Sequence, residues 1–478
     1  MGTGSLLGVA GEVLRSARPK QIVLSGPSGF LGSRVLQSIL DVHQFRKSQG
    51  MEPGEAILLS SSPGNLMSRL HDRYGSETLS TVRASRVDYY HQHQVDSWHD
   101  QLGSMGVGGH DAVFVNLAAM AGPVPGKPDA MMAVNYAAPM AAARACEALG
   151  FGHWIQSSTQ ATKAERSGQV PYSRWKAMCD FSLTRLEKLP VSVTVLGLLY
   201  CKEAGIVGQR GNTLNMVDLS LLPLTPIMGD GSAPLQPLEV GDAADRIAFL
   251  ALSEARDRPS QGYTSKDRWA SPNIAPSRQY TLRFYDAVGP ETMSMLEMQR
   301  RFASLNGRTL RPVHVDYRNF ELVLNVASLG NLNRQFVSLL RSEQDSKKPI
   351  VGKHEVFERL LGPQARLTAL NESLLTGRKA AKPRSFPWMN TITWMWRNWG
   401  VIPPGMALVA ETLLVAFFGP TSGPMWTRIR LVWVGAVSSA AGVVTAATVV
   451  HGPGLAAALA ASPLGRLLGA LRDLLAGG

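Results

Sequence analysis

The amino-acid sequence predicts an α/β protein whose first part is a doubly wound Rossmann domain built on a parallel sheet. Over the first 210 residues, short apolar runs rich in β-branched side chains alternate with helical stretches. This pattern is typical of parallel strands that helices cover on both faces. A glycine-rich loop stands between the first strand and the first helix, where Rossmann domains bind phosphates. A smaller C-terminal α/β part and a helical, membrane-associated C-terminal extension are expected to complete the chain.

The chain of 478 residues divides into five parts. We expect an N-terminal extension over 1–20, the Rossmann core over 21–210, and an α/β part that completes the fold over 211–342. A basic, irregular linker or interaction region follows over 343–400, and an apolar helical extension over 401–478. Strands are expected at residues 21–25, 56–60, 81–88, 111–116, 153–157, 191–199 and 280–288. Helices are expected at residues 32–40, 131–149, 172–186, 241–252 and 294–306.

The loop after the first strand predicts a dinucleotide-binding site. Gly26 permits a tight turn, Gly29 lets backbone N–H groups approach a pyrophosphate, and Gly32 allows the helix and the strand to pack closely. The N-terminus of the following helix adds partial positive charge. The competing interpretation is a glycine turn without a ligand. The loop residues that we expect to bind the cofactor are Gly26, Ser28, Gly29, Phe30, Leu31 and Gly32.

The end of the second strand favours NADP(H) over NAD(H). A site that prefers NAD usually places an acid there to bind the ribose hydroxyls, whereas this chain has Ser60 and Ser61. Hydroxyl donors, with Arg34 and Arg69 as counter-charges, would suit a 2′-phosphate. NAD(H) remains the alternative, and so does a merely solvated serine loop.

A second group of candidate residues follows the fourth and fifth strands. Asn116, Ala118 and Ala119 end the fourth strand with small side chains, which would leave room beneath the two riboses. The alternative is ordinary packing of small residues. Ser157 and Ser158 follow the fifth strand, and a hydroxyl there would orient a carbonyl.

Tyr172 and Lys176 are spaced to share one face of a helix. A lysine ammonium beside a phenol would lower the pKa of the phenol, so that it could exchange a proton near neutral pH. The pattern Y-x-x-x-K is common by chance, and its significance here comes from its place after the glycine loop and the serines. Tyr172, Lys176 and Ser158 are therefore the candidate catalytic residues.

Composition favours an anionic partner and gives no indication of a metal. The formal net charge is +12, which suits a nucleotide, an acidic lipid surface or an acidic protein. Nucleic acid is not expected, because the chain has no long basic block and no helix-turn-helix spacing. Its three cysteines form no paired framework or CxxC site, and its ten histidines include no HExxH-like set. We therefore expect buried free thiols and no metal.

The C-terminal part has the composition of a membrane-associated segment. A run over 431–450 carries no charge, follows Arg428 and Arg430, and is long enough to span a bilayer. A shorter run over 405–419 contains Glu411, and a span, a re-entrant segment and a surface helix are equally consistent with it. Tryptophans cluster just before that run, as at a membrane–water interface. A buried core helix is the alternative.

In the order of its motifs, the chain resembles the short-chain dehydrogenase/reductase family, in its extended or atypical branch. The resemblance covers roughly residues 20–320 and implies that Asp88, Asn116, Ser157, Tyr172 and Lys176 also line the cofactor site. The matching elements are the glycine loop, Asp88, 116–119, Asn135, Ser157 and Ser158, Tyr172 with Lys176, 236–244 and 285–291. The Arg-Pro-Gly segment common in active extended members is absent after the sixth strand, where 196–200 reads Leu-Gly-Leu-Leu-Tyr.

Within that branch the chain is most similar to the Rossmann-type accessory subunit of mitochondrial respiratory complex I, through its loop and the stretch 353–375. The resemblance implies a non-catalytic, NADPH-binding subunit beside other subunits of a membrane respiratory complex and an anionic lipid membrane. It would lie at the mitochondrial inner membrane, with the Rossmann domain on the matrix side. The basic stretch 1–20 is compatible with organellar targeting. The alternatives are an active membrane-anchored NAD(P)-dependent reductase or epimerase, and a soluble reductase with a helical C-terminal domain.

Overall fold

The computed structural model describes the Rossmann core and the segments that pack around it. The described residues are 6, 11, 17–18, 20–120, 127, 129–163, 170–200, 220, 225–253, 282–305, 307, 309–315, 351–362 and 365–370. The expected apolar extension over 401–478, with its runs at 405–419 and 431–450, lies outside the described residues, as do most of 1–20 and most of 343–400.

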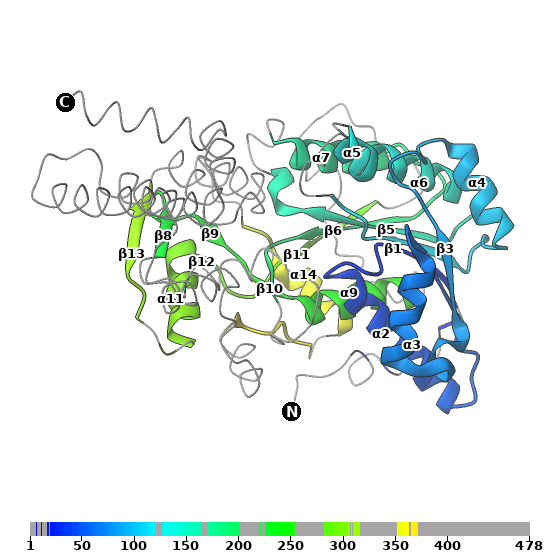
Figure 1. The fold of residues 1–478 in the computed structure, drawn as a ribbon, viewed down its shortest axis with the longest axis horizontal. Helices are drawn as coiled ribbons and strands as arrows, with labels where there is room; N and C mark the ends of the chain where they lie inside the picture. The colour runs from blue at the N-terminus through cyan, green and yellow to red at the C-terminus, as the bar shows by residue number, and fades with distance from the viewer. Residues whose placement is uncertain are drawn as a thin grey trace, which may run out of the picture. The chain divides into compact units, whose positions relative to one another are not determined.

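Seven parallel strands form the central sheet (Figure 1). They are β1 (Gln21–Ser25), β2 (Glu55–Ser60), β3 (Val82–Arg86), β4 (Ala112–Asn116), β5 (His153–Thr159), β6 (Val191–Leu196) and β11 (Arg283–Ala287). Their order is β11-β6-β5-β4-β1-β2-β3, and every neighbouring pair is parallel. The chain winds outward from β1 in one direction and from β4 in the other, which confirms the predicted doubly wound fold and places its switch point between β1 and β4.

Helices cover both faces of this sheet (Figure 1). One face packs against α2 (Gly32–Ser48), α3 (Pro63–Thr78) and α9 (Val240–Leu252). The other packs against α4 (Val95–Ser104), α6 (Ala138–Ala148) and α7 (Pro171–Leu183). Because alternate side chains of a strand point to opposite faces, Leu24 joins the first layer and Val23 the second. The apolar strands are therefore buried on both sides, as their composition predicts.

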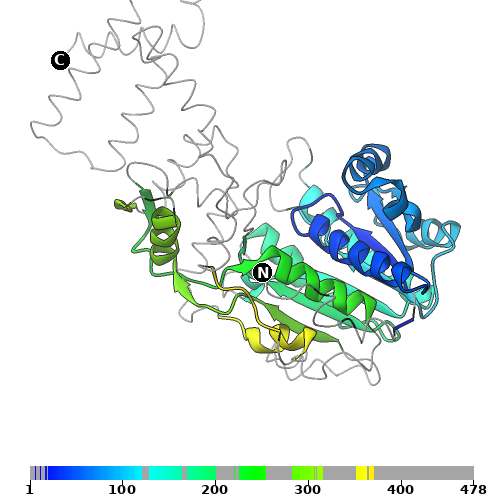
Figure 2. The same ribbon diagram turned by 90° about the horizontal axis from the view of Figure 1, so that it is seen from below.

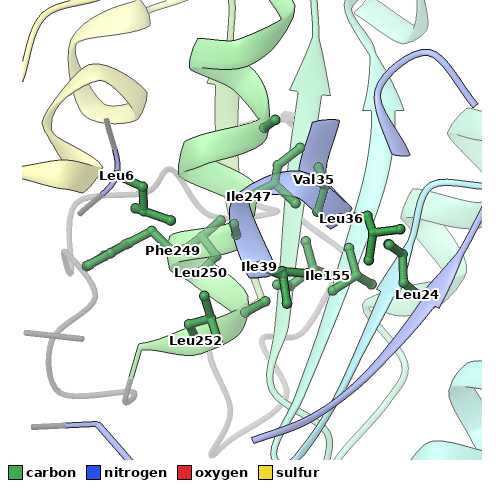
Figure 3. Close-up of a cluster of buried hydrophobic side chains, with 14 of the residues drawn as sticks. Leu6, Leu24, Val35, Leu36, Ile39, Ile155, Ile247, Phe249, Leu250 and Leu252 are labelled. Atoms are coloured by element: carbon green, nitrogen blue, oxygen red, sulfur yellow. The ribbon is translucent and has the colours of Figure 1, made fainter. Parts of the chain in front are cut away.

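The first apolar layer brings together helices that lie far apart in the sequence. Figure 2 shows α9 beside α2, and Figure 3 shows the aliphatic side chains between them and the sheet, among them Ile39 and Ile247. Ile39, Ile155 and Ile247 have no exposed surface. Burial of side chains of this size contributes about 1.5–3 kcal/mol each, so this contact fixes α2, and the loop before it, against the sheet.

Helices α3 and α4 were not predicted from the sequence, and one predicted helix has a different form. Helix α3 begins at Pro63 after Ser62, and α4 begins at Val95. The predicted helix over 131–149 is present as α5 (Ala130–Met132), a π-helical turn (Ala133–Ala137) and α6. The predicted strand over 191–199 ends at Leu196, and β7 (Leu199–Tyr200) is a separate strand.

The described part of 211–342 has the expected α/β character. Strand β8 (Thr225–Met228) pairs in parallel with β13 (Pro312–Val315), and β10 (Leu238–Glu239) pairs in parallel with β7. Strand β9 (Pro234–Leu235) pairs in antiparallel fashion with β12 (Met293–Ser294). Helix α11 (Met295–Leu305) follows β12 directly.

Residues 351–370, as far as they are described, are not the irregular linker that their composition suggests. They contain α14 (His354–Glu358) and a 3-10 turn, Arg359–Leu361. Phe357, Leu360 and Leu361 are buried in the same apolar layer as α2 and α9. This late segment therefore completes the Rossmann core, and we call it the return segment.

Three further sequence expectations bear on the described residues. Cys146 and Cys179 are buried free thiols, as expected. In the part of the chain that the structure describes, no His, Cys, Asp or Glu side chains gather in threes as metal ligands would. None of the helices described combines the length and the hydropathy that a membrane crossing requires.

Candidate functional site

The glycine loop lies at the carboxyl end of β1, at the switch point of the sheet. Its backbone turns back on itself, because the Gly29 N–H donates to the Gly26 carbonyl at 3.0 Å. Ser28 and Gly29 are exposed at its rim, whereas Leu31 and Gly32 are buried beneath them. The loop thus presents backbone to the outside at the point where α2 begins.

Two of the three glycines have no room for a side chain. A Cβ at Gly32 would lie 2.0 Å from the Gly26 carbonyl oxygen. A Cβ at Gly26, whose φ is +70°, would lie 2.9 Å from the Ala118 nitrogen. At Gly29 the nearest atom would be the Gly26 oxygen at 3.2 Å. Gly26 and Gly32 are therefore needed by the fold itself, whereas Gly29 keeps the exposed rim free of bulk.

The loop offers backbone donors to an anion. The N–H groups of Phe30 and Leu31 have no backbone acceptor among the residues that the structure describes. They stand at the N-terminus of α2, a helix of 17 residues with no acidic side chain in its first turn. Unused N–H groups and the helix dipole both favour a negatively charged ligand at this position. The site therefore fits the pyrophosphate of a dinucleotide.

The end of β4 lies on the other side of the switch point from the end of β2, and Ser25 joins it to the loop. The Ser25 Oγ donates to the Asn116 Oδ1 at 2.6 Å and accepts from the N–H groups of Leu117 and Ala118, each at 3.1 Å. Asn116 and Ala118 are buried, and Ala119 is exposed. This brings the predicted residues Asn116 and Ala118 directly beside Gly26.

A buried polar chain continues from Asn116 across the sheet. The Asn116 Nδ2 donates to the Gln156 Oε1 at 2.9 Å, and the Gln156 Nε2 donates to the Ser157 carbonyl at 3.0 Å. The Lys176 Nζ donates to that same carbonyl at 3.0 Å. Hydrogen bonds therefore connect the loop after β1 with the lysine on α7. Ser25 and Gln156 escaped the sequence analysis because each continues an otherwise apolar strand.

Asn135, a matching residue of the family resemblance, holds the chain that leaves β4. Its Oδ1 accepts from the Met120 N–H at 3.1 Å, and its Nδ2 donates to the carbonyls of Met120 at 2.8 Å and Met131 at 2.9 Å. It lies in the π-helical turn, a form of backbone that is often found at functional sites. The loop after β4 is thereby fixed at the carboxyl end of the sheet.

The residues predicted to bind the adenosine end of the cofactor lie at the end of β2 and on the helices α2 and α3. Ser60 ends β2, and its Oγ accepts from the Ser62 N–H at 3.2 Å, so its proton can still be donated to a ligand. Ser61 and Arg69 are exposed, and Arg34 is partly buried in the first turn of α2. The Arg69 Nε donates to the Asn65 carbonyl at 3.3 Å.

Asp88 lies beyond β3 at the same edge of the sheet. It is exposed, accepts from the Tyr90 N–H at 3.0 Å, and contacts the His91 Nδ1 at 2.9 Å. The hydrogen bond from His91 lowers the pKa of Asp88 below its usual value. Asp88 is therefore a carboxylate at neutral pH and could accept a hydrogen bond from a ligand.

Helix α7 brings Lys176 and Tyr172 to the end of β5, but their ionisation differs from the prediction. Burial raises the pKa of Tyr172 to about 12, and the charge of Asp180 contributes to this rise. Burial also lowers the pKa of Lys176. The expected lowering of the phenol's pKa by Lys176 is therefore not found, because burial and the charge of Asp180 raise that pKa and the lysine amine is held by the Ser157 carbonyl.

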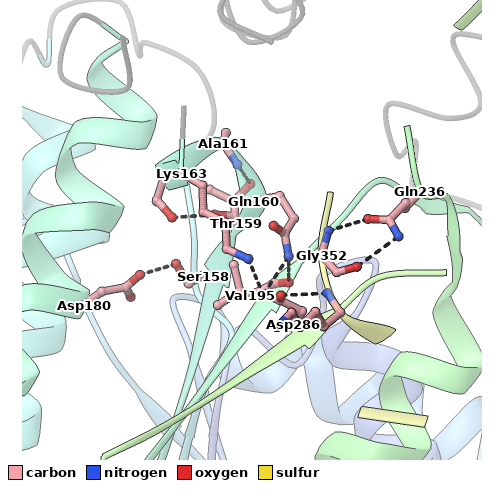
Figure 4. A network of polar contacts seen from close by, with 12 residues as sticks. Ser158, Thr159, Gln160, Ala161, Lys163, Asp180, Val195, Gln236, Asp286 and Gly352 are labelled. Carbon is pink, nitrogen blue, oxygen red and sulfur yellow. Dashed lines mark hydrogen bonds and ion pairs between the residues drawn. The ribbon is translucent and has the colours of Figure 1, made fainter. Parts of the chain in front are cut away.

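Ser158 does not face the site as the sequence analysis supposed. Its Oγ donates to the Asp180 Oδ2 at 2.5 Å, and Figure 4 shows the two side chains pointing toward one another. Asp180 is fully buried on α7, and sequence reasoning missed it although it continues the spacing of Tyr172 and Lys176. The hydroxyl at the very end of β5 belongs to Thr159, which is partly exposed; among the described residues its oxygen accepts a long contact of 3.4 Å from the Ala161 N–H.

A second polar cluster joins the end of β5 to the return segment (Figure 4). Asp286 on β11 accepts from the Lys163 Nζ at 2.6 Å and the Gln160 Nε2 at 3.1 Å, and its other oxygen accepts from the Lys353 N–H at 2.9 Å. The Gln236 side chain binds both backbone groups of Gly352. These contacts hold the return segment beside the candidate site.

The sheet order and the place of the loop at the switch point define the described unit as a Rossmann-type α/β fold. Hydrogen bonds link Ser25, directly before the loop, through Asn116 and Gln156 to the Ser157 carbonyl and Lys176, and Tyr172 lies one helical turn before Lys176 on α7. Ser60, Ser61 and Asp88 lie farther along the same edge of the sheet.

No protein-family model and no curated protein matches the chain. Similar solved structures include an epimerase from Methanothermobacter thermautotrophicus, at 12% identity and a TM-score of 0.48 over 85% of this chain and 98% of that one. Pal from Bacillus thuringiensis is 14% identical, with a TM-score of 0.46 over 74% and 96% of the two chains. UDP-glucose 4-epimerase from Thermus thermophilus, solved with NAD, is 16% identical, with a TM-score of 0.42 over 76% and 100%.

Proposed function

We propose that this protein binds NAD(P)(H) at the glycine loop and holds it as a structural cofactor. The observation that carries the proposal is the cradle itself: backbone N–H groups at the start of α2, with no room for a Cβ at Gly26 or Gly32. A pyrophosphate is the ligand that such a cradle fits best. Ser60 and Ser61, with Arg34 and Arg69 nearby in sequence, favour NADP(H).

Two features of the nicotinamide end favour a binding role over turnover. Burial and the charge of Asp180 raise the pKa of Tyr172 to about 12, farther from neutral pH than the ordinary value, which makes its phenol a poorer general base. The Ser158 hydroxyl proton is directed to Asp180 instead of the crevice. A bound nicotinamide ring would donate or accept a hydride. The two features just described disfavour the proton transfer that would accompany this step.

The finer proposal is that the protein is an accessory subunit of mitochondrial respiratory complex I. Its support is the resemblance in the loop and in 353–375, the net charge of +12 and the apolar composition of 401–478. The protein would then lie at the inner membrane with its Rossmann domain on the matrix side, and the cofactor would stabilise it because it binds only the folded state. Co-migration with that complex on a native gel tests this, and migration as a free protein contradicts it.

The alternative function is an NAD(P)-dependent reductase or epimerase. What favours it is the pairing of Lys176 and Tyr172 at the end of β5, with Thr159 as a hydroxyl able to donate to a carbonyl. In this function Tyr172 would act as the proton donor, Lys176 would hold the cofactor's ribose, and Thr159 would orient the substrate.

Replacing Gly29 by Asp is expected to remove the bound cofactor and to leave the fold intact. An added Cβ would lie 3.2 Å from the Gly26 oxygen, with no other described atom among its near contacts, and the rest of the side chain would start from the exposed rim, so we expect the apo protein to tolerate it. Its carboxylate would stand at the exposed rim and repel the pyrophosphate. The measurement is the nucleotide content of the purified full-length protein, with circular dichroism as the check on folding. Unchanged NAD(P)(H) content in a folded variant would refute the proposed site.

Replacing Tyr172 by Phe separates the binding function from the enzymatic one. The variant should keep the cofactor, because the glycine loop and Lys176 are unaltered, and should show no change in any assay of assembly. If the protein is an enzyme, the same variant should lose its turnover by about 100-fold or more. Dehydrogenase or epimerase activity that disappears in this variant, measured from mildly acidic to alkaline pH, would contradict the structural role.

A further inference from the structure

Helix α7 is fixed to β5 by two neighbouring polar contacts. Tyr172, Lys176 and Asp180 follow one another at intervals of four residues and so share one helix face. The Lys176 Nζ donates to the Ser157 carbonyl at 3.0 Å, and the Ser158 Oγ donates to the Asp180 Oδ2 at 2.5 Å. Two successive turns of α7 are thus joined to two successive residues of β5.

We propose that Asp180 and Ser158 form a positioning pair for the nicotinamide end of the dinucleotide site. The inference rests on the proposed function and extends it by giving both residues a role. The pair holds α7 at the height along β5 that places Lys176 and Tyr172 beside the end of the strand. Neither Asp180 nor Ser158 touches the cofactor in this arrangement.

The chemistry of the pair supports positioning instead of direct contact. A serine hydroxyl has one proton, and here Asp180 receives it, so Ser158 cannot also donate to a ligand. Ser158 is 2% exposed and Asp180 is 0% exposed, so water does not compete for either group. A short hydrogen bond to a buried carboxylate is among the strongest and most directional available in a protein.

Apolar packing alone does not explain the acid at this position. The face of α7 that meets the sheet already buries Cys179 and Leu183, and a carboxylate among them is costly unless it fixes something specific. The charge of Asp180 also acts on Tyr172, whose pKa it helps to raise. The pair therefore influences both the place and the protonation of the phenol.

A double-mutant cycle on the full-length protein tests the pair. NADPH reaches both ends of the site, whereas adenosine 2′,5′-bisphosphate reaches only the adenosine end. Ser158→Ala and Asp180→Ala should each weaken NADPH binding by about tenfold, and the double variant should be no weaker than the worse single one. Binding of adenosine 2′,5′-bisphosphate should change less than about twofold. Asp180→Asn keeps an oxygen that accepts from Ser158 and should restore most of the affinity.

The control is Ser182→Ala, two residues from Asp180 on the same helix, which should leave both affinities unchanged. Losses that add in the double variant, or equal losses for both ligands, would overturn the pair. If Asp180→Ala does not fold, Ser158→Ala and Asp180→Asn, which are milder changes, carry the test. Failure of the unaltered protein to bind NADPH or NADH would refute the proposed function, whereas unchanged NADPH affinity in every variant would refute the pair alone.

Discussion

Replacing Gly32 by Ala is expected to abolish dinucleotide binding and to destabilise the fold at the same time. The new methyl group would be placed 2.0 Å from the Gly26 carbonyl oxygen and 2.9 Å from the carbonyl carbon, and neither backbone atom can move without opening the loop. We expect NADPH affinity to fall by more than about 100-fold. The free energy of unfolding should fall by about 2–4 kcal/mol. Isothermal titration and denaturant unfolding measure the two effects.

The matched control is Gly64→Ala. Gly64 lies in α3, and a Cβ there would have no atom within 4 Å. Alanine is the better helix former, so this variant should be unchanged or more stable by up to about 1 kcal/mol. A Gly32→Ala variant that behaves like the control would show that α2 does not approach the loop as closely as the structure has it.

Replacing Arg246 by Met is expected to detach the return segment. Arg246 is 2% exposed on α9. Its guanidinium donates to the carbonyls of Phe357 at 3.0 Å, Glu358 at 3.2 Å and Asp242 at 3.2 Å. Methionine fills much of the space but removes all three hydrogen bonds. The loss of stability should be about 3–5 kcal/mol.

Denaturant unfolding measures that loss, and limited proteolysis within 351–370 shows whether the segment is released. Arg300→Met on α11 is the control, because Arg300 is exposed. Its effect should stay within about 0.5 kcal/mol. Equal stability of the two variants would mean that Arg246 does not hold the return segment.

The sequence predicts the sheet and the glycine loop well because both depend on local patterns. Each strand of the core is a short apolar run, and the loop has its glycines at fixed spacing, so position along the chain is enough to find them. Helix α3 also had a local signal, the Ser62-Pro63 start, which the sequence analysis did not use.

The contacts that the sequence did not predict depend on packing between distant segments. The direction in which the Ser158 side chain points depends on the position of α7 along β5. The spacing of residues in the sequence does not specify that position. The bond from Arg246 to Phe357 spans 111 positions, and the return segment has no apolar period that indicates a core element. The pKa of Tyr172 could not be inferred either, because it is set by burial and by the charge of Asp180, and both depend on how α7 packs.

The return segment has a consequence for how the protein is made. Phe357, Leu360 and Leu361 lie in the same apolar layer as α2 and α9, so that layer keeps an open side until they arrive. During synthesis, the return segment must therefore leave the ribosome before the apolar layer of the Rossmann core can be complete. Until then the nascent chain has an uncovered apolar surface, and exposed surface of this kind favours aggregation.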